Sequence, residues 1–253
     1  FLTNKFRAEY FLELDNKLSW EVSYTNNSMR PVGALVLNYT DPVTQEVRPL
    51  NYLRTSEFGL TMRYAPNEQY VQGRSYRIPF YNRYPVFNLY FNAGVKGFLG
   101  GEANYQSLRF NVFKRFYMSF LGNMRVEFEA GKYWGEGVPY FLLHMPRANQ
   151  TLAYFVTSFN MMNYQEFVSD QYVQVMAQHN FNGYIFNKIP LLRKLKLREI
   201  ISFKMIYGRL SDANNPDLKE NNELIQFIRD DEGNRISYTL EKQPYMEGSA
   251  EVG

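Results

Sequence analysis

The stretch NYQSLRFNVFKRFYMSFLGNMRVEFEAGKYW, residues 104–134, decides the fold class of this chain. It contains two long segments, residues 104–117 and 124–134, which are joined at Leu121, Gly122 and Asn123. Apolar and polar side chains alternate along both segments, and this period of two is typical of β-strands. The stretch therefore predicts a long antiparallel hairpin.

The two faces of the second segment differ in chemistry. Apolar side chains face one way, and the charged side chains are left mostly for the other face. The apolar set is Val126, Phe128 and Ala130, and the charged set is Arg125, Glu127, Glu129 and Lys132. Charges at this density do not suit the dry interior of a β-sandwich, because a buried charge is costly unless it is paired.

The same alternation recurs along the chain, in residues 6–15, 18–25, 58–64, 87–95, 171–184 and 195–208. Several of these segments run about ten to fourteen residues, whereas strands of soluble domains cluster near five or six. A tilted strand needs roughly nine to eleven residues to cross a bilayer. We therefore expect an all-β fold, an antiparallel transmembrane β-barrel in an outer membrane. The candidates for its aromatic girdles are Tyr105, Tyr117, Tyr133, Trp134, Tyr172, Tyr184 and Tyr207.

The composition excludes several other classes of protein. The 253 residues include 21 Phe and 21 Tyr, and 45% are hydrophobic, which excludes a disordered chain. The absence of cysteine excludes disulfides, thiolate zinc sites and cysteine nucleophiles. A net charge of +3 is small for a nucleic-acid binder, so we expect no nucleic-acid partner. No segment is apolar enough to suggest a transmembrane helix.

The connections between the expected strands fall into two classes. Residues 119–123 and 187–194 are short, whereas residues 135–170 and 209–244 are long and rich in Asn, Asp and Pro. Outer-membrane barrels have short periplasmic turns and longer extracellular loops. We therefore assign the short connections to the periplasm and the long ones to the outside. No linker divides the chain, so residues 1–253 are expected to be part of a single barrel domain.

The residues that could carry chemistry show no catalytic or metal-binding spacing. The chain has two histidines, His144 and His179, and neither belongs to an HExxH pattern. No GxSxG elbow supports a hydrolase, and the acidic residues 211–232 lack EF-hand spacing, so we interpret them as an extracellular loop. We expect a protein that is not an enzyme, with no catalytic residue, no metal site and no cofactor.

Five basic residues form one cluster in the second half of the chain. They are Lys188, Arg193, Lys194, Lys196 and Arg198. Charge clusters are usually solvated turns, so the first interpretation is that these five residues form a solvated turn. The alternative is a periplasmic basic patch that meets anionic lipid headgroups or an acidic partner.

Long stretches of the chain resemble a known family. They include RIPFYNRYPVFNLYFNAGVKG at residues 77–97, EAGKYWGEGVPYFLLHMPRANQT at 129–151, MNYQEFVSDQYVQVMAQHNFNG at 162–183 and NKIPLLRKLKLREIISFKMIYG at 187–208. The resemblance is to an uncharacterised outer-membrane family of Bacteroidota, which joins an N-terminal carboxypeptidase-regulatory-like domain to a C-terminal barrel. It implies a barrel similar to the BamA and TamA superfamily of Gram-negative cell envelopes, whose members insert or translocate proteins.

The resemblance also implies a loop that folds back into the lumen. The corresponding stretch is NMMNYQEFVSD, residues 160–170, with Met162 and Asn163 where the superfamily has an arginine-glycine pair. The candidate lumen-loop residues are Asn163, Tyr164, Glu166, Phe167 and Asp170. The chain ends in EGSAEVG, which looks like the middle of a strand. We therefore expect that this is a partial chain and that an N-terminal domain and the last strands are missing.

These observations lead to one expected function and two alternatives. We expect insertion, translocation or assembly of outer-membrane or secreted proteins, with outer-membrane lipid, lipopolysaccharide and other envelope proteins as partners. The first alternative is a channel for small solutes, with Arg125, Glu127, Glu129, Arg198 and Lys204 setting its selectivity. The second is a soluble, aromatic-rich β-sandwich that binds carbohydrate.

Overall fold

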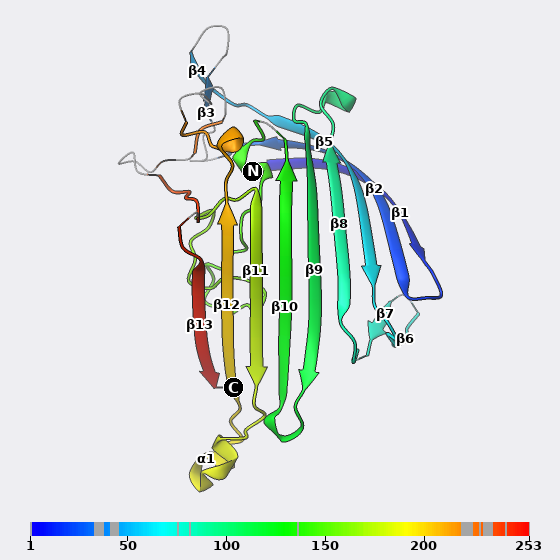
Figure 1. Ribbon diagram of the computed structural model, residues 1–253, viewed down its shortest axis with the longest axis vertical. Coiled ribbons are helices and arrows are strands. Elements are labelled where there is room, and N and C mark those ends of the chain that lie inside the picture. Colours follow the sequence, from blue (N-terminus) through cyan, green and yellow to red (C-terminus); the bar gives the residue numbers. More distant parts are fainter. Residues whose placement is uncertain are drawn as a thin grey trace.

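The computed structural model of the chain contains one large antiparallel sheet (Figure 1). It describes residues 2–32, 38–40, 46–74, 76–80, 82–135, 137–218, 225–227, 229, 235–240 and 242–252. Part of the acidic stretch singled out above, residues 219–224 and 230–232, lies outside the described residues.

The large sheet has nine strands in the order β1-β2-β5-β8-β9-β10-β11-β12-β13. They are β1 Leu2–Glu13, β2 Leu18–Arg30, β5 Leu53–Tyr64, β8 Val86–Gly94, β9 Tyr105–Tyr117, β10 Asn123–Trp134, β11 Gln171–Asn180, β12 Glu199–Arg209 and β13 Tyr245–Val252. Each strand pairs with its neighbours in antiparallel register. The expected all-β, antiparallel class is confirmed.

Two of the expected strands differ from those observed. The strand expected over residues 171–184 ends at Asn180, and the one expected from residue 195 begins at Glu199. The reason is a helical turn between them, α1 Pro190–Leu195. Proline at the first helical position has its φ preset for a helix, and Lys196 ends the turn in the left-handed conformation with φ 54°.

The remaining strands are short. β3 Asn38–Thr40 pairs with β4 Val47–Pro49, and β6 Tyr70–Gln72 pairs with β7 Arg77–Pro79. A β-sandwich needs a second sheet that packs face to face with the first. Within the described ranges these two-stranded pieces are the other sheets, so the described structure does not show the two packed sheets of the sandwich alternative.

The register sorts side chains into rows across the sheet. One row runs through Phe128 and consists of Tyr64, Phe87, Val112, Phe128, Val175, Met205 and Met246. The adjacent row runs through Glu129 and includes Ser19, Arg63, Asn88, Asn111, Glu129 and Gln174. The second row continues through Ile206 and Tyr245. One face of the sheet is therefore apolar, and the opposite face is mostly polar but carries apolar side chains on β12 and β13. We call them the outer and the inner face.

Three tyrosines expected in the aromatic girdles belong to the inner face instead. Tyr105 and Tyr172 are buried, and their hydroxyls donate to Glu57 (2.7 Å) and Glu129 (2.8 Å). Tyr133 lies in the same inward register. Tyr105 and Tyr172 each pair with a glycine on the next strand, Gly94 and Gly131, and the ring covers that glycine.

Lys132 also differs from expectation. It shares the parity of Phe128 and Ala130, so it lies on the outer face, and not with Glu127 and Glu129. Because β10 ends at Trp134, Lys132 stands at one end of the apolar face rather than in its centre.

Connections gather at the two ends of the sheet (Figure 1). The tight turns after β1 and β9 share one end with the connection that holds α1. The long connections that follow β10 and β12 leave the sheet at the other end. The two connections predicted to be short and the two predicted to be long thus lie at opposite ends, as expected, but the connection from β11 to β12 is longer than predicted and spans residues 181–198. Residues 65–85, at the first end, form another long connection, which contains β6 and β7.

The sheet has two edges, β1 and β13. Across the described part of the chain each pairs with one neighbour, β2 and β12, so the sheet is not closed on itself. Among the described residues, the helices are all too short and too polar to cross a membrane.

Candidate functional site

The long connection from β10 to β11 packs against the inner face. We call residues 135–170 the inserted loop. Phe159 and Met162 of this loop are buried against Tyr172, Met176 and Ile206 of β11 and β12. A second cluster joins Val138, Tyr140, Leu143 and Val168 to Leu210. A loop with a core of its own is held in one conformation, since apolar burial contributes roughly 25 cal/mol per Å².

A buried ion pair anchors the tip of the loop. Lys204 of β12 and Glu247 of β13 lie on the inner face, with Nζ 3.3 Å from Oε1 and side chains only 3% and 7% exposed. The Lys204 ammonium also donates to the backbone carbonyls of Phe155 (3.0 Å) and Ser158 (2.5 Å). It lies 4.5 Å from the centre of the Tyr154 ring.

Glu247 completes the anchor from the other side. Its carboxylate accepts hydrogen bonds from the backbone N–H of Asn160 (2.9 and 3.0 Å) and of Met161 (3.1 Å). The two charged groups therefore also bind the backbone of the loop. The ammonium donates to loop carbonyls, and the carboxylate accepts from loop N–H groups. A buried pair with this many partners fixes geometry, and removing either member leaves the other charge uncompensated.

Asp170 holds the end of the loop where β11 begins. Its Oδ2 accepts from the backbone N–H of Ser211 (3.0 Å), from the Ser211 hydroxyl and from the Asn214 amide (3.2 Å). Asn214 in turn accepts from the backbone N–H of Val138 (3.0 Å). Both ends of the inserted loop are thus tied to the connection that follows β12.

The five predicted lumen-loop residues differ in their surroundings. Asp170 is buried, and Phe167 packs on Tyr245 with ring centres 5.5 Å apart. Glu166 accepts from the backbone N–H of Asn163 (2.7 Å), and its own carbonyl accepts from Tyr238 (2.7 Å). The side chains of Asn163 and Tyr164 are exposed. The fold therefore brings Glu166, Phe167 and Asp170 into the docked part of the loop and leaves the other two at its surface.

A polar cavity of about 280 Å³ lies between the loop and the inner face. Arg109, Arg125, Glu127, Glu129, His144 and Arg147 are among the residues that line it. The His144 ring stacks on Tyr172 at 3.4 Å between centres. Its Nε2 is buried and has no hydrogen-bond partner in the described residues. The groups are mixed in charge and hydrogen-bonded to one another, for example Asn111 to Glu127 (3.0 Å).

We expect docking of the loop to be sensitive to acid because of His144. Burial, together with the guanidinium groups of Arg109 and Arg147, lowers the pKa of His144 to about 3. In an undocked loop it would titrate near 6.5. The undocked form therefore takes up a proton that the docked form excludes, so docking is strongest above about pH 6.5 and weakens as the pH falls toward 3.

We expect amide exchange in the inserted loop, corrected for its intrinsic rate, to be faster at pH 4.5 than at pH 7. His144→Phe keeps a ring on Tyr172 and removes the titrating group, so the difference between the two pH values should shrink. Full acid sensitivity in His144→Phe would contradict this assignment.

The predicted basic cluster lies at the opposite end of the sheet from the inserted loop's connection. Lys188, Arg193, Lys194, Lys196 and Arg198 surround α1 and are all exposed. Lys188 lies 3.9 Å from the ring centre of Tyr184. Leu191 and Leu195 of α1 are exposed as well. The structure therefore brings the five cations together on one exposed turn and keeps them apart from the loop residues.

The described residues contain no group of three His, Asp or Glu side chains that could hold a metal ion. The Nε2 atom of His179 lies 2.8 Å from the carbonyl oxygen of Leu121, and its ring stacks on Phe181.

Glu247 is a residue that the sequence did not single out. The channel alternative placed Lys204 among the lumen residues that set selectivity, whereas it is buried and paired. One signal was available, because Lys204 and Glu247 are charges of opposite sign in the last two strands, each flanked by uncharged residues.

The family comparison covers most of the chain. Residues 2–213 match the family described as "Family of unknown function (DUF5686) C-terminal domain". No curated protein matches the chain. Among solved structures, the chain is similar to the crystal structure of BamA from Haemophilus ducreyi lacking POTRA domains 1-3, with a TM-score of 0.49 and 11% identity. That alignment covers 98% of this chain and 54% of the other, so this chain spans about half the length of that structure.

Proposed function

The chain belongs to the DUF5686 family, as its C-terminal domain, and from that premise we propose that it is the membrane-spanning part of an outer-membrane β-barrel. The observation that carries the proposal is the opposite polarity of the two sheet faces. The outer face is a continuous apolar surface through Phe128, and the inner face is a hydrogen-bonded polar surface through Glu129. Lipid in contact with the outer face explains its apolar side chains. Water and a docked loop in contact with the inner face explain its polar side chains.

A sheet in lipid cannot keep free edges, because unpaired backbone groups have no water to bind there. We therefore propose that β1 and β13 are joined in the intact protein through further strands, which close the barrel. The N-terminal carboxypeptidase-regulatory-like domain and an origin in Bacteroidota stay predictions.

The proposed role is insertion, translocation or assembly of envelope proteins, without enzymatic chemistry. The inserted loop supports this role over a passive channel. The channel alternative requires Arg125, Glu127 and Glu129 to line an open lumen, whereas here they face a loop that is anchored by Lys204. A barrel with an occupied interior can contact partner proteins at its rim, at its exposed turns and at the seam where its first and last strands meet.

Partners of this kind would meet the chain at the end that carries α1. There the basic patch of Lys188, Arg193, Lys194, Lys196 and Arg198 surrounds the exposed Leu191 and Leu195. Cations beside apolar side chains suit either anionic lipid headgroups or an acidic protein surface. We propose that the protein does not bind nucleic acid.

Single-cysteine labelling tests the membrane location and its orientation together, because the chain has no cysteine of its own. Leu99 is 63% exposed at the end with the long connections, and Leu191 is 74% exposed on α1 at the other end. In intact cells, a membrane-impermeant maleimide should label Leu99→Cys. It should label Leu191→Cys only after the outer membrane is permeabilised.

The full-length protein should also sediment with membranes and need detergent for extraction. This control shows whether the labelled protein is inserted in the membrane. A protein that stays in solution without detergent would overturn the proposed location. Labelling of Leu191→Cys in intact cells, with Leu99→Cys protected, would reverse the proposed orientation.

A further inference from the structure

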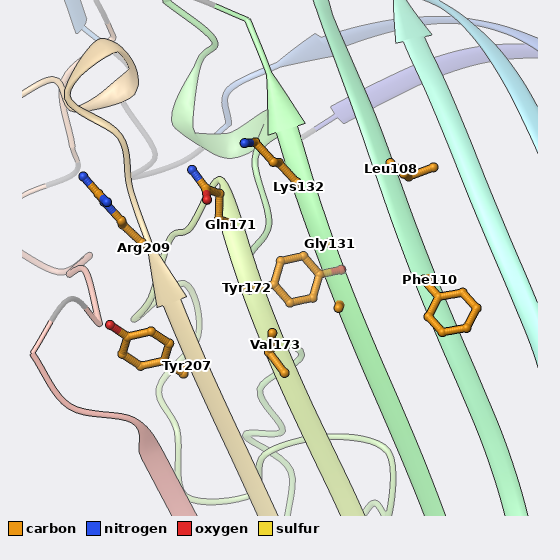
Figure 2. Close-up of a pocket in the computed structure, with 10 residues that line it drawn as sticks. Leu108, Phe110, Gly131, Lys132, Gln171, Tyr172, Val173, Tyr207 and Arg209 are labelled. Atoms are coloured by element: carbon orange, nitrogen blue, oxygen red, sulfur yellow. The ribbon is translucent and has the colours of Figure 1, made fainter.

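A hollow interrupts the apolar outer face at the end with the long connections. Its volume is about 630 Å³, and its lining includes Leu108, Phe110, Ala130, Lys132, Val173 and Arg209 (Figure 2). Because it lies on the outer face, the hollow opens away from the inserted loop and toward the lipid of the proposed membrane.

The small side chain of Ala130 explains the hollow. The register places Ala130 between Phe110 of β9 and Val173 of β11, and Tyr207 of β12 follows in the same row. Two aromatic walls thus flank a floor of Ala130 and Val173. Neighbouring strands lie about 4.8 Å apart, so the space between these walls is wide enough for acyl chains that run along the strands.

Polar groups gather at one end of the hollow. Lys132, Gln171 and Arg209 are register neighbours in a single row, and in Figure 2 their nitrogen atoms lie at the same end of the pocket. Lys132 and Arg209 are exposed, and in the described parts of the chain neither forms an ion pair. Lys132 lies 5.5 Å from the ring centre of Trp134, an arrangement that suits the border between hydrocarbon and headgroups.

We propose that this hollow binds one molecule of a phosphorylated glycolipid, the lipid A part of lipopolysaccharide. The Arg209 guanidinium and the Lys132 ammonium bind a lipid phosphate, and the Gln171 amide donates to the same headgroup. An acyl chain fills the space over Ala130 between Phe110 and Tyr207. The inference rests on the proposed function, because the end with the long connections is then extracellular and faces the leaflet that contains lipopolysaccharide.

Charge complementarity favours this occupant over an apolar protein segment. Two cations without an ion-pair partner among the described residues stand on β10 and β12, with the Gln171 amide on β11 between them, and a doubly charged phosphate neutralises both. A hydrophobic helix or strand of a partner would cover the same hollow but would leave Lys132 and Arg209 desolvated and unpaired.

The test uses full-length protein purified in detergent, titrated with hexa-acylated lipid A and followed by native mass spectrometry. Lys132→Gln/Arg209→Gln should weaken binding of lipid A at least about tenfold, since both charge-assisted contacts to the phosphate are lost. Ala130→Leu keeps both charges and fills the floor of the hollow, so it should weaken binding as well.

Two control variants match these changes. Lys114 lies on the outer face toward the other end of β9, and Ala177 occupies the outer face of β11 away from the hollow. Lys114→Gln and Ala177→Leu should bind lipid A as the unmodified protein does. Equal binding by Lys132→Gln/Arg209→Gln would overturn the proposal, as would equal affinity for phosphatidylglycerol and lipid A.

These outcomes are distinguishable from failure of the proposed function. If the protein is found in solution without detergent, the membrane location itself fails. The protein can instead lie in the membrane and be labelled at Leu99→Cys as expected. If it then binds lipid A and phosphatidylglycerol equally, or if the substitutions leave lipid A binding unchanged, only the lipid site fails.

Discussion

Lys204→Ala should release the inserted loop from the inner face. The substitution removes the partner of Glu247 and the donor to two loop carbonyls, while the carboxylate stays buried. Breaking a buried pair in this way costs about 3–5 kcal/mol. That corresponds to a shift of at least about a hundredfold in the docking equilibrium. In full-length protein held in detergent, we expect limited proteolysis to cut within residues 135–170 faster than in the unmodified protein.

Two comparisons separate this anchor from a general loss of charge. Glu247→Ala should expose the same segment, because it removes the acceptor for the backbone of Asn160 and Met161. Glu46→Gln removes an exposed ion pair with Arg48 and should leave the cleavage pattern unchanged, since exposed pairs contribute about 1 kcal/mol or less. A loop that stays protected in Lys204→Ala would contradict the anchoring role.

The same variant separates the proposed function from the channel alternative. If the docked loop occupies the interior of a closed barrel, unmodified protein in planar bilayers should pass little current and Lys204→Ala should add conducting events. A passive channel whose selectivity is set by Lys204 behaves differently. It conducts steadily before the substitution, and the change alters its ion preference.

Much of the sheet could be predicted from the sequence because strand periodicity is local. The alternation of Phe128 with Glu129 is enough to assign faces. Lys132 shows where chemistry misleads. Its charge suggested the polar face, whereas counting residues from Phe128 assigns it to the outer face, where a lysine at a strand end still reaches polar surroundings.

The anchor of the loop could not be predicted in the same way. Lys204 and Glu247 meet because β12 and β13 pair in one register, and both then contact loop backbone near Asn160. Each step depends on contacts between residues far apart in the sequence. The inward position of Tyr172 had a local signal, since parity assigns it to the face opposite Val173, but tyrosine near a strand end also suggests a membrane interface.

Gly131→Ala should destabilise the contact between Tyr172 of the sheet and the inserted loop. A Cβ at position 131 would lie less than 3.0 Å from the Tyr172 ring and its hydroxyl. That ring has little room to move, because it is buried, stacks on His144 at 3.4 Å and donates to Glu129. Overpacking alone costs about 1–3 kcal/mol, and a lost hydrogen bond to a carboxylate adds roughly 1.5–3 kcal/mol.

We therefore expect the thermal unfolding midpoint of full-length protein in detergent to fall by several degrees in Gly131→Ala. Gly248→Ala is the matched control, because Gly248 is also a strand glycine and the nearest atom to an added Cβ there is 3.6 Å away. Its midpoint should change little. Combining Tyr172→Leu with Gly131→Ala should cost less than the sum of the two single changes, since the clash disappears with the ring. An unchanged midpoint in Gly131→Ala would mean that the ring can leave the glycine without cost, and Tyr172 would then not fix the loop to the sheet.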